Sequence, residues 1–263
     1  MVDFQCKDAY TMEDLRKIIA LLRSEDGCPW DREQTHESIR RNFIEETYEA
    51  CEAIDAKDPD LLREELGDVL TQVIFHARIE EEQGRFNLDD VADVTCKKLI
   101  FRHPHIFGDT SVSDTEEVLL NWDELKRQEK HHETTAQAME AVARSLPATW
   151  RAEKIQDKAR KVGFDWPDAP PAVTKLEEEL AELKTAMADG TGIREELGDL
   201  LFSVINVARL LEIDPEAALH EASDKFIRRF AYLEQAAAKR GQTLPSMSLD
   251  EMETLYQEGK ERL

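Results

Sequence analysis

Two copies of the run Glu-Glu-Leu-Gly-Asp, at 64–68 and 195–199, carry the residues best suited to do chemistry. Each copy is preceded by a second acidic cluster, at 45–49 in the first half and at 178–182 in the second. Side chains three residues apart share one face of a helix, so each cluster places two carboxylates together. If the helices that carry them are antiparallel neighbours, four carboxylates converge in each half. The two sets are Glu46, Glu49, Glu65 and Asp68, and Glu179, Glu182, Glu196 and Asp199.

Such a set of carboxylates predicts a site for a hard divalent cation. Four partly desolvated carboxylates repel one another, which raises their pKa values unless a cation compensates. Mg²⁺, or Mn²⁺ in its place, takes oxygen ligands and leaves coordination positions for water and substrate phosphates. Gly67 and Gly198 stand at equivalent positions, and a glycine inside a helix costs about 1 kcal/mol relative to alanine. Their presence predicts a close approach of a helix or a ligand at both places.

The acidic composition offers a simpler explanation. With 57 Asp and Glu among 263 residues, Glu-x-x-Glu pairs arise freely by chance. The same order of acidic clusters, glycine and apolar flank occurs twice, however, and this duplication favours a functional group. Duplication could also reflect a repeated scaffold, so a non-catalytic helical interaction module stays open as an alternative. A ferritin-like di-iron bundle needs Glu-x-x-His on two core helices, whereas the matches here, Glu33/His36 and Glu129/His132, lie in or beside polar loops.

Basic residues complete the pattern on one face of a long predicted helix in the second half. They are Lys225, Arg228 and Arg229, within about 100° of arc beside an apolar stripe. The first half has Lys98 and Arg102 at matching positions, but Phe101 where the second half has Arg228. We therefore expect the second half to be the main catalyst, because a cation aimed at transition-state charge can be worth several kcal/mol.

An aromatic residue stands four positions before a lysine near the end of each half. The pairs are Trp122 with Lys126 and Tyr256 with Lys260. On a helix the two side chains of such a pair are neighbours, so the ring could stack on a base while the cation meets a phosphate.

The net charge of −23 argues against nucleic acid polymers and anionic membranes as partners, because both would repel such a surface. A polyanionic substrate would have to be held through metal ions and local Lys or Arg residues. The sequence shows no signal peptide, no run of about 18 apolar residues and no Cys-x-x-Cys pair. These features predict a soluble, cytoplasmic protein with reduced thiols.

Nearly every structured segment predicts a helix, and no alternating strand pattern competes. The expected fold is all-α, with two tandem four-helix-bundle-like domains at 1–130 and 148–263 and a linker at 131–147. The loops at 26–31 and 163–167 resemble each other. Expected helices of the first half are 11–24, 37–56, 60–82, 88–102 and 114–130, and those of the second half are 148–161, 172–188, 192–211, 214–240 and 248–262.

Together these motifs make the chain resemble the MazG family of nucleoside triphosphate pyrophosphohydrolases. The family signature, Glu-x-x-Glu followed by a spacer and Glu-x-x-Asp, is matched in both halves. The runs Gly-Cys-Pro-Trp-Asp (27–31), Arg-His-Pro-His (102–105) and Lys-Phe-Ile-Arg-Arg (225–229) extend the similarity over essentially the whole chain. The resemblance implies a homodimer of tandem helical domains. It also implies Mg²⁺-dependent hydrolysis of NTPs and dNTPs to the monophosphate and pyrophosphate.

The same resemblance implies roles for individual residues. Glu178 would act with the metal ligands, orienting the attacking water or taking its proton. The family often has Trp where Tyr256 stands. Metal would bind at Glu179, Glu182, Glu196 and Asp199, with a second, weaker site at Glu46, Glu49, Glu65 and Asp68. Nucleotide contacts would come from Lys175, Glu178, Glu195, Lys225, Arg228, Arg229, Tyr256 and Lys260.

Overall fold

The protein is all-α, as the sequence predicts. The structure, a computed structural model, describes residues 4–112, 114–115, 117–118, 121–122, 125–126 and 133–262. Within these ranges the chain forms helices and no strand. None of these helices combines the length and apolarity that a membrane span needs. The chain divides into two compact units, Met1–Lys126 and Arg127–Leu263, so the stretch expected to be a linker lies in the second unit.

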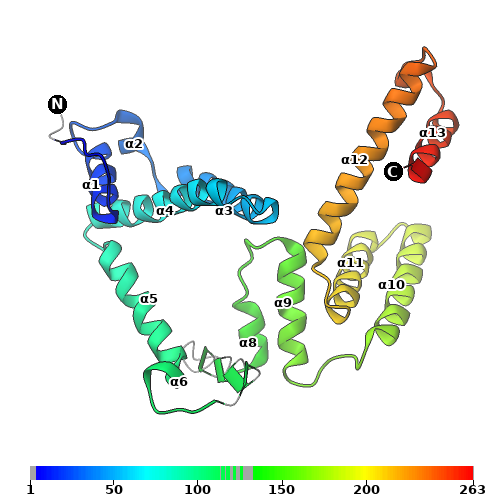
Figure 1. Ribbon diagram of the computed structural model, residues 1–263. Helices are drawn as coiled ribbons and strands as arrows, with labels where there is room; N and C mark the ends of the chain where they lie inside the picture. Colours follow the sequence, from blue (N-terminus) through cyan, green and yellow to red (C-terminus); the bar gives the residue numbers. More distant parts are fainter. Residues whose placement is uncertain are drawn as a thin grey trace. The chain divides into compact units, whose positions relative to one another are not determined.

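The first unit is built around an antiparallel pair of long helices, α3 and α4, which lie side by side (Figure 1). A two-residue turn joins them. In it Lys57 adopts a left-handed conformation with φ of 55°, and the Asp58 side chain accepts hydrogen bonds from the first backbone N–H groups of α4. Such a short turn forces the two helices to be neighbours. The helices of this unit are α1 (Met12–Leu22), α2 (Pro29–Glu33), α3 (His36–Ala56), α4 (Pro59–Glu82), α5 (Leu88–Arg102) and α6 (Pro104–Phe107).

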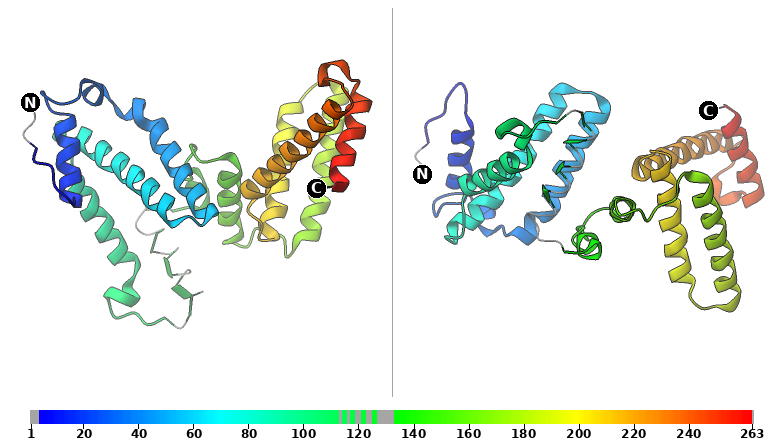
Figure 2. Two further views of the ribbon diagram at one scale, coloured as in Figure 1. Left: turned by 45° about the horizontal axis from the view of Figure 1, so that its top comes forward. Right: turned by 90° about the horizontal axis from the view of Figure 1, so that it is seen from below.

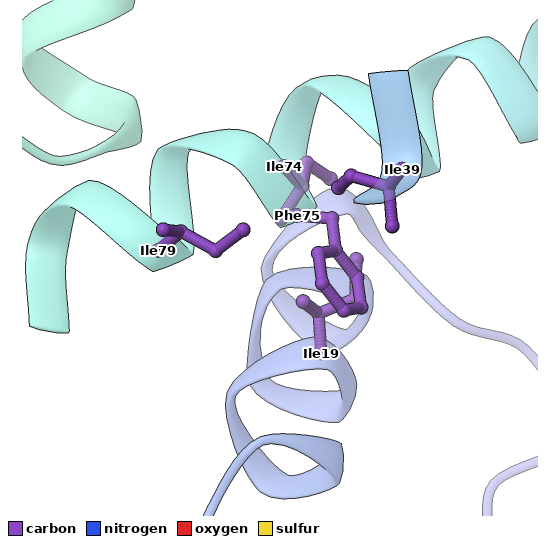
Figure 3. Close-up of a cluster of buried hydrophobic side chains, with 5 residues drawn as sticks. All are labelled: Ile19, Ile39, Ile74, Phe75 and Ile79. Carbon is purple, nitrogen blue, oxygen red and sulfur yellow. The ribbon is translucent and has the colours of Figure 1, made fainter. Parts of the chain in front are cut away.

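A small apolar core fixes α1 against this pair. Ile19 of α1 and Ile39 of α3 pack with side chains from the C-terminal half of α4, among them Ile74 and Phe75 (Figure 3). Ile19 and Ile74 are each only 2% exposed. Burying a side chain of this size stabilises the fold by roughly 1.5–3 kcal/mol. The core therefore fixes the C-terminal half of α4, while the acidic residues lie on the N-terminal half of this helix.

The second unit repeats the pair as α10 and α11, which again lie side by side in both further views (Figure 2). Gly190 and Gly192, with φ of 71° and 74°, make the turn between them. Helix α9 packs on α11 and also touches α8 and α12, while α13 folds back along α12. The helices are α8 (Thr135–Glu140), α9 (Ala148–Arg160), α10 (Ala169–Asp189), α11 (Ile193–Leu210), α12 (Pro215–Lys239) and α13 (Leu249–Arg262), with a 3₁₀ turn at Leu244–Ser246.

Three short helices depart from the sequence prediction. Helices α2, α6 and α8, of 5, 4 and 6 residues, form where loops or a linker are expected. They are too short to show an apolar period. Their signals are local, since Pro29 and Pro104 occupy the first turn of α2 and α6, and Thr134 caps α8. The helix predicted at 114–130 lies largely outside the described residues.

A buried ionic group ties the end of α4 to the start of α3. Arg85 donates hydrogen bonds from Nε and Nη2 to the carboxylate of Glu80. The Oε1 atom of Glu80 also lies 2.5 Å from His36 Nε2. His36 and His76 also stack, with Nδ1 atoms 2.7 Å apart. The hydrogen bonds from Arg85 and then His36 lower the pKa of Glu80 to about 2.

This group predicts a pH-dependent loss of stability in Glu80→Gln. A carboxylate whose folded pKa lies near 2, against an ordinary 4.5, stabilises the fold above pH 4.5. That stabilisation is lost as the pH falls through the folded pKa. Glu80→Gln should therefore unfold at a lower temperature than the parent at pH 7, and the difference should shrink below pH 4.5. Thermal melts from pH 7 to pH 3 check this, with exposed Glu52→Gln as the control. A difference that stays constant over this range would contradict the assignment.

Candidate functional site

In the second unit, three of the predicted carboxylates meet between α10 and α11. Oxygen atoms of Glu179, Glu196 and Asp199 lie within 4.8 Å of one another, a spacing compatible with one metal ion. Glu179 is 7% exposed, Glu196 is half-buried and Asp199 is exposed. The cluster thus has a buried inner side and an open outer side, which suits a metal that also binds substrate.

Glu182, the fourth predicted ligand, lies one turn further along α10 at the edge of this cluster. Partial desolvation raises the pKa of Glu182; the charge of Lys175 opposes this rise, and those of Glu179 and Glu178 add to it. Glu182 therefore shares the field of the cluster, although its oxygens lie outside the group of three.

The first unit has a corresponding cluster made of Glu46, Glu49 and Glu65, whose oxygens also lie within 4.8 Å of one another. Partial desolvation, followed by the charges of Asp68 and Glu49, raises the pKa of Glu46. Desolvation and the charges of Glu49 and Asp68 likewise raise the pKa of Glu65. Burial is the larger cause of both pKa shifts, and repulsion from the neighbouring carboxylates adds to it.

A lysine distinguishes the second cluster from the first. Lys175 Nζ lies 2.8 Å from Glu179 Oε1 and 3.0 Å from Glu178 Oε1. The hydrogen bond to Glu179, and then the one to Glu178, raise the pKa of Lys175 above its ordinary value. Lys175 stands four residues before Glu179. In the first half, Asn42 stands four residues before the equivalent Glu46. The buried Glu179 thus has a cation of its own, whereas Glu46 pairs with no cation among the described residues.

The donors in both clusters fit a hard divalent ion. All are carboxylate oxygens supplied by two rigid helices, which is the ligand set that Mg²⁺ and Mn²⁺ prefer. The di-iron alternative finds no comparable support. His36 binds Glu80 and stacks on His76, and Glu129 and His132 lie outside the described residues. Across the ranges that the structure describes, the candidate metal clusters contain no histidine.

Gly67 and Gly198 predict a close approach of a helix or a ligand, and the structure contradicts the first alternative within the described chain. A Cβ built at either glycine would meet no atom of another protein segment within 4 Å. Both glycines face away from the packed side of their helices. No protein segment of the described chain therefore explains why glycine stands there.

The residues expected to contact nucleotide do not all gather at the carboxylates. Lys225 and Arg228 are exposed on α12 and Arg229 is half-buried. In the chain from residue 133 to 262, none of the three forms an ion pair with the acidic cluster. Tyr256 packs against Phe226, with ring centroids 5.6 Å apart. The structure therefore brings the carboxylates together but leaves the α12 cations in a separate hairpin with α13.

The remaining predicted contacts lie nearer the carboxylates or within that second hairpin. Glu178 is exposed and bonded to Lys175, and Glu195 is exposed in the first turn of α11. Lys260 Nζ lies 5.4 Å from the Tyr256 ring centre, as the four-residue spacing predicts. In the first unit, Trp122 lies edge-on to His103.

Comparison with known proteins matches both parts of the chain that carry a carboxylate cluster. The model of the MazG nucleotide pyrophosphohydrolase domain matches residues 34–107 and 172–232, each segment containing one carboxylate cluster. The chain belongs to the MazG family. Tyr256 and Lys260 lie beyond the matched segments, in the α13 helix of this MazG chain.

Two relatives within the MazG family match almost end to end. The nucleoside triphosphate pyrophosphohydrolase/pyrophosphatase MazG of Thermotoga maritima is 44% identical over 248 residues, covering 94% of this chain and 95% of the relative. The nucleoside triphosphate pyrophosphohydrolase of Escherichia coli K12 is 42% identical over 254 residues, covering 95% and 97%. The uncharacterized protein YabN of Bacillus subtilis is 45% identical over 249 residues, which are 94% of this chain and 51% of that protein.

The ion pair between Lys175 and Glu179 predicts that either the lysine or a bound metal ion can compensate the negative charge of Glu179. Lys175→Met removes the cation from a buried carboxylate, so the metal-free protein should unfold at a lower temperature. Added Mg²⁺ should raise that temperature more in the variant than in the parent, because the ion then supplies the only compensating charge. Thermal unfolding with and without Mg²⁺ measures both effects.

Lys184→Met, at an exposed position of the same helix, is the matched control for this experiment. If the two variants respond alike, with and without Mg²⁺, Lys175 does not compensate Glu179.

Proposed function

We propose that this chain hydrolyses nucleoside triphosphates, both NTPs and dNTPs, to the monophosphate and pyrophosphate at the second carboxylate cluster. The observation that carries the proposal is the convergence of Glu179, Glu196 and Asp199 within 4.8 Å, with Glu179 buried. With Glu182 beside them, these residues would hold Mg²⁺, or Mn²⁺ in its place. The activity named for the relatives from Thermotoga maritima and Escherichia coli supports the same conclusion.

The chemistry divides between the bound ion and the side chains. Mg²⁺ would supply Lewis acidity at the phosphate oxygens and lower the pKa of water. Glu178, whose Oε1 lies 3.0 Å from Lys175 Nζ, would accept the proton of the attacking water. As the water oxygen bonds to phosphorus, the bond to the pyrophosphate oxygen breaks and pyrophosphate leaves. Lys175 carries positive charge beside these groups and would offset the negative charge of the phosphates.

Differences between the halves favour the second as the main catalytic site. Only the second cluster has a lysine, Lys175, against Asn42 in the first half. Phe101 stands where the second half has Arg228, so the later helix of the first half has one cation fewer, although Lys98 and Arg102 match Lys225 and Arg229. A site with fewer cations for the transition-state charge loses up to several kcal/mol of stabilisation. The first half would then bind nucleotide weakly or serve mainly in packing.

Single-site inactivation tests this assignment. Glu196→Gln should lower kcat by at least about 100-fold, because it removes a charged metal ligand without changing side-chain size. Glu65→Gln, the same change at the equivalent position, should leave most of the activity. The assay uses Mg²⁺ with each NTP and dNTP, and separates monophosphate plus pyrophosphate from diphosphate plus phosphate. Equal losses in the two variants, or a loss only in Glu65→Gln, would reverse the assignment.

We also propose that the chain is a homodimer. Helix α11 exposes Leu197, Leu201 and Val204 by 46%, 56% and 45%, on one face at spacings of four and three residues. Helix α10 exposes an apolar residue every seven positions, namely Val173, Leu180 and Met187. Apolar residues at these spacings form seams between helices. A second copy of the α10–α11 pair would cover both stripes.

The dimer proposal predicts that Leu201→Glu dissociates the protein. Placing a charge in the middle of an apolar seam removes roughly 1.5–3 kcal/mol of burial and adds a desolvation cost. Sedimentation velocity measures the association state, and Thr191→Glu, in the exposed α10–α11 turn, is the control. A parent protein that sediments as a monomer at micromolar concentration contradicts the dimer.

A further inference from the structure

Lys175 holds one of the carboxylates that would bind the metal ion in the second unit. Its Nζ atom lies 2.8 Å from Glu179 Oε1 and 3.0 Å from Glu178 Oε1. The side chain of Glu179 is only 9% exposed, whereas that of Lys175 is 38% exposed. The buried carboxylate is therefore paired with an ammonium group that remains within reach of solvent and of an incoming ligand.

The charge of Lys175 also acts on a second predicted ligand. Lys175 stands four residues before Glu179 and seven before Glu182, so the three side chains share one face of α10. Burial raises the pKa of Glu182, and the charge of Lys175 opposes this rise. One ammonium group thus partly compensates the negative charge of two predicted metal ligands.

Lys175 and a metal ion compete for this carboxylate. Lys175 contacts Oε1 of Glu179, and Glu179 is a member of the group of three oxygens whose spacing fits one ion. Two cations beside one partly buried carboxylate repel each other, because the effective dielectric constant there is lower than in water. An ion that binds alone must therefore displace the ammonium group from Glu179, and the lost ion pair weakens its binding.

A phosphate chain that arrives with the ion removes this cost. Lysine carries its charge on a flexible four-carbon stem, so the displaced ammonium group of Lys175 can turn to a phosphate oxygen and form a charge-assisted hydrogen bond there. Lys175 then stabilises the complex of ion and phosphate with which it would otherwise compete. Two ligands that each favour the arrangement needed by the other bind with positive coupling.

The first half provides an internal comparison. Asn42 stands four residues before Glu46, at the position of Lys175. Oxygen atoms of Glu46, Glu49 and Glu65 lie within 4.8 Å of one another, as do those of the second cluster. Because the amide of asparagine carries no charge, an ion at the first cluster has no ammonium group to displace at this position. The two clusters should therefore differ in how readily they bind a metal ion without nucleotide.

We propose that Lys175 makes the second cluster bind a divalent cation together with a triphosphate, and disfavours binding of the cation alone. This inference rests on the proposed function, since the triphosphate is the ligand that would bring the phosphate oxygens. Lys175 acts through Glu179 and is in this respect a positioning residue. The first cluster, with Asn42, binds the free cation without this coupling.

Titration with Mn²⁺, followed by electron paramagnetic resonance of the unbound ion, tests the first part of this proposal in the full-length protein. A Glu65→Gln background removes a ligand of the first cluster, so that the second is observed by itself. In this background Lys175→Met should bind free Mn²⁺ at least about fivefold more tightly than the parent, which is the low end of typical coupling between ligands. Lys175→Arg keeps a cation and should bind Mn²⁺ as weakly as the parent.

Calorimetry with the α,β-methylene analogue of ATP tests the second part. Carbon replaces oxygen in the bond that would be cleaved, so the analogue stays intact. Mg²⁺ should strengthen its binding by a factor at least about fivefold larger in the parent than in Lys175→Met. The complex that the analogue forms with Mg²⁺ in solution affects both proteins alike and cancels in this comparison.

Two further variants guard against an indirect effect of the substitution. Lys184→Met removes a lysine from an exposed position of the same helix and should behave as the parent in both measurements. Asn42→Lys, in a Glu196→Gln background that disables the second cluster, should weaken binding of free Mn²⁺ at the first cluster. This gain of a lysine tests the competition even if Lys175→Met proves unstable. Equal responses of Lys175→Met and Lys184→Met overturn the inference.

The Mn²⁺ titration requires no turnover, so it separates this inference from the proposed function. A chain that hydrolyses triphosphates, but whose affinity for free Mn²⁺ is the same with and without Lys175, overturns the coupling alone. A chain that hydrolyses none, but binds free Mn²⁺ more tightly in Lys175→Met, overturns the proposed function and leaves the competition at Glu179 supported.

Discussion

Electrostatic repulsion between carboxylates on paired helices is the constraint around which each half is built. In each pair, two helices joined by a tight turn hold three carboxylates within 4.8 Å of one another. In the first half, burial and the charges of neighbouring carboxylates raise the pKa values of Glu46 and Glu65, so the ionised group is unfavourable without a cation. The apolar packing of that half lies elsewhere, at the C-terminal half of α4. A cation shared by the carboxylates would convert the repulsion into binding energy, which is why such a group is suited to metal and phosphate chemistry.

The two halves differ in the positive charge that lies next to their carboxylates. In the second half Lys175 forms an ion pair with the buried Glu179. In the first half Asn42 stands at the position of Lys175, and the described residues form no ion pair with Glu46, Glu49 or Glu65. The unit that contains the ion pair also has a pocket of about 450 Å³ between α9, α11 and the loop at 163–166. The two copies of one scaffold therefore differ in the charge next to their carboxylates.

The exposed apolar stripes on α10 and α11 bear on association with a second copy of the chain. Helices α10 and α11 bury one face against each other and present a second apolar face outward. Although α9 also packs on α11, the apolar residues that stay exposed leave the bundle incomplete. The carboxylates lie on these same helices, so covering the outer face with a second copy would also limit how far the metal-binding helices can move apart.

The sequence alone determined the helices that carry the carboxylates, because their signals are local. Asp58 with Pro59 starts α4, and each Glu-Glu-Leu-Gly-Asp run places its acidic residues by helical period. The same local reasoning misses α2, α6 and α8, whose few residues show no period. For Gly67 and Gly198 it leaves a helix or a ligand as the neighbour, and the folded chain excludes a neighbouring helix because nothing lies within 4 Å of a Cβ built there.

Other features depend on side chains brought together from separate elements. The choice of Glu179, Glu196 and Asp199 as the close group, with Glu182 at its edge, follows from how α10 sits on α11. The pocket requires Ala159, Asn206 and the loop at 163–166 to meet, and three-dimensional packing alone reveals the volume they leave unfilled. A helical period gives the direction of each side chain from its own helix. Distance and empty space between helices arise only when the chain is folded.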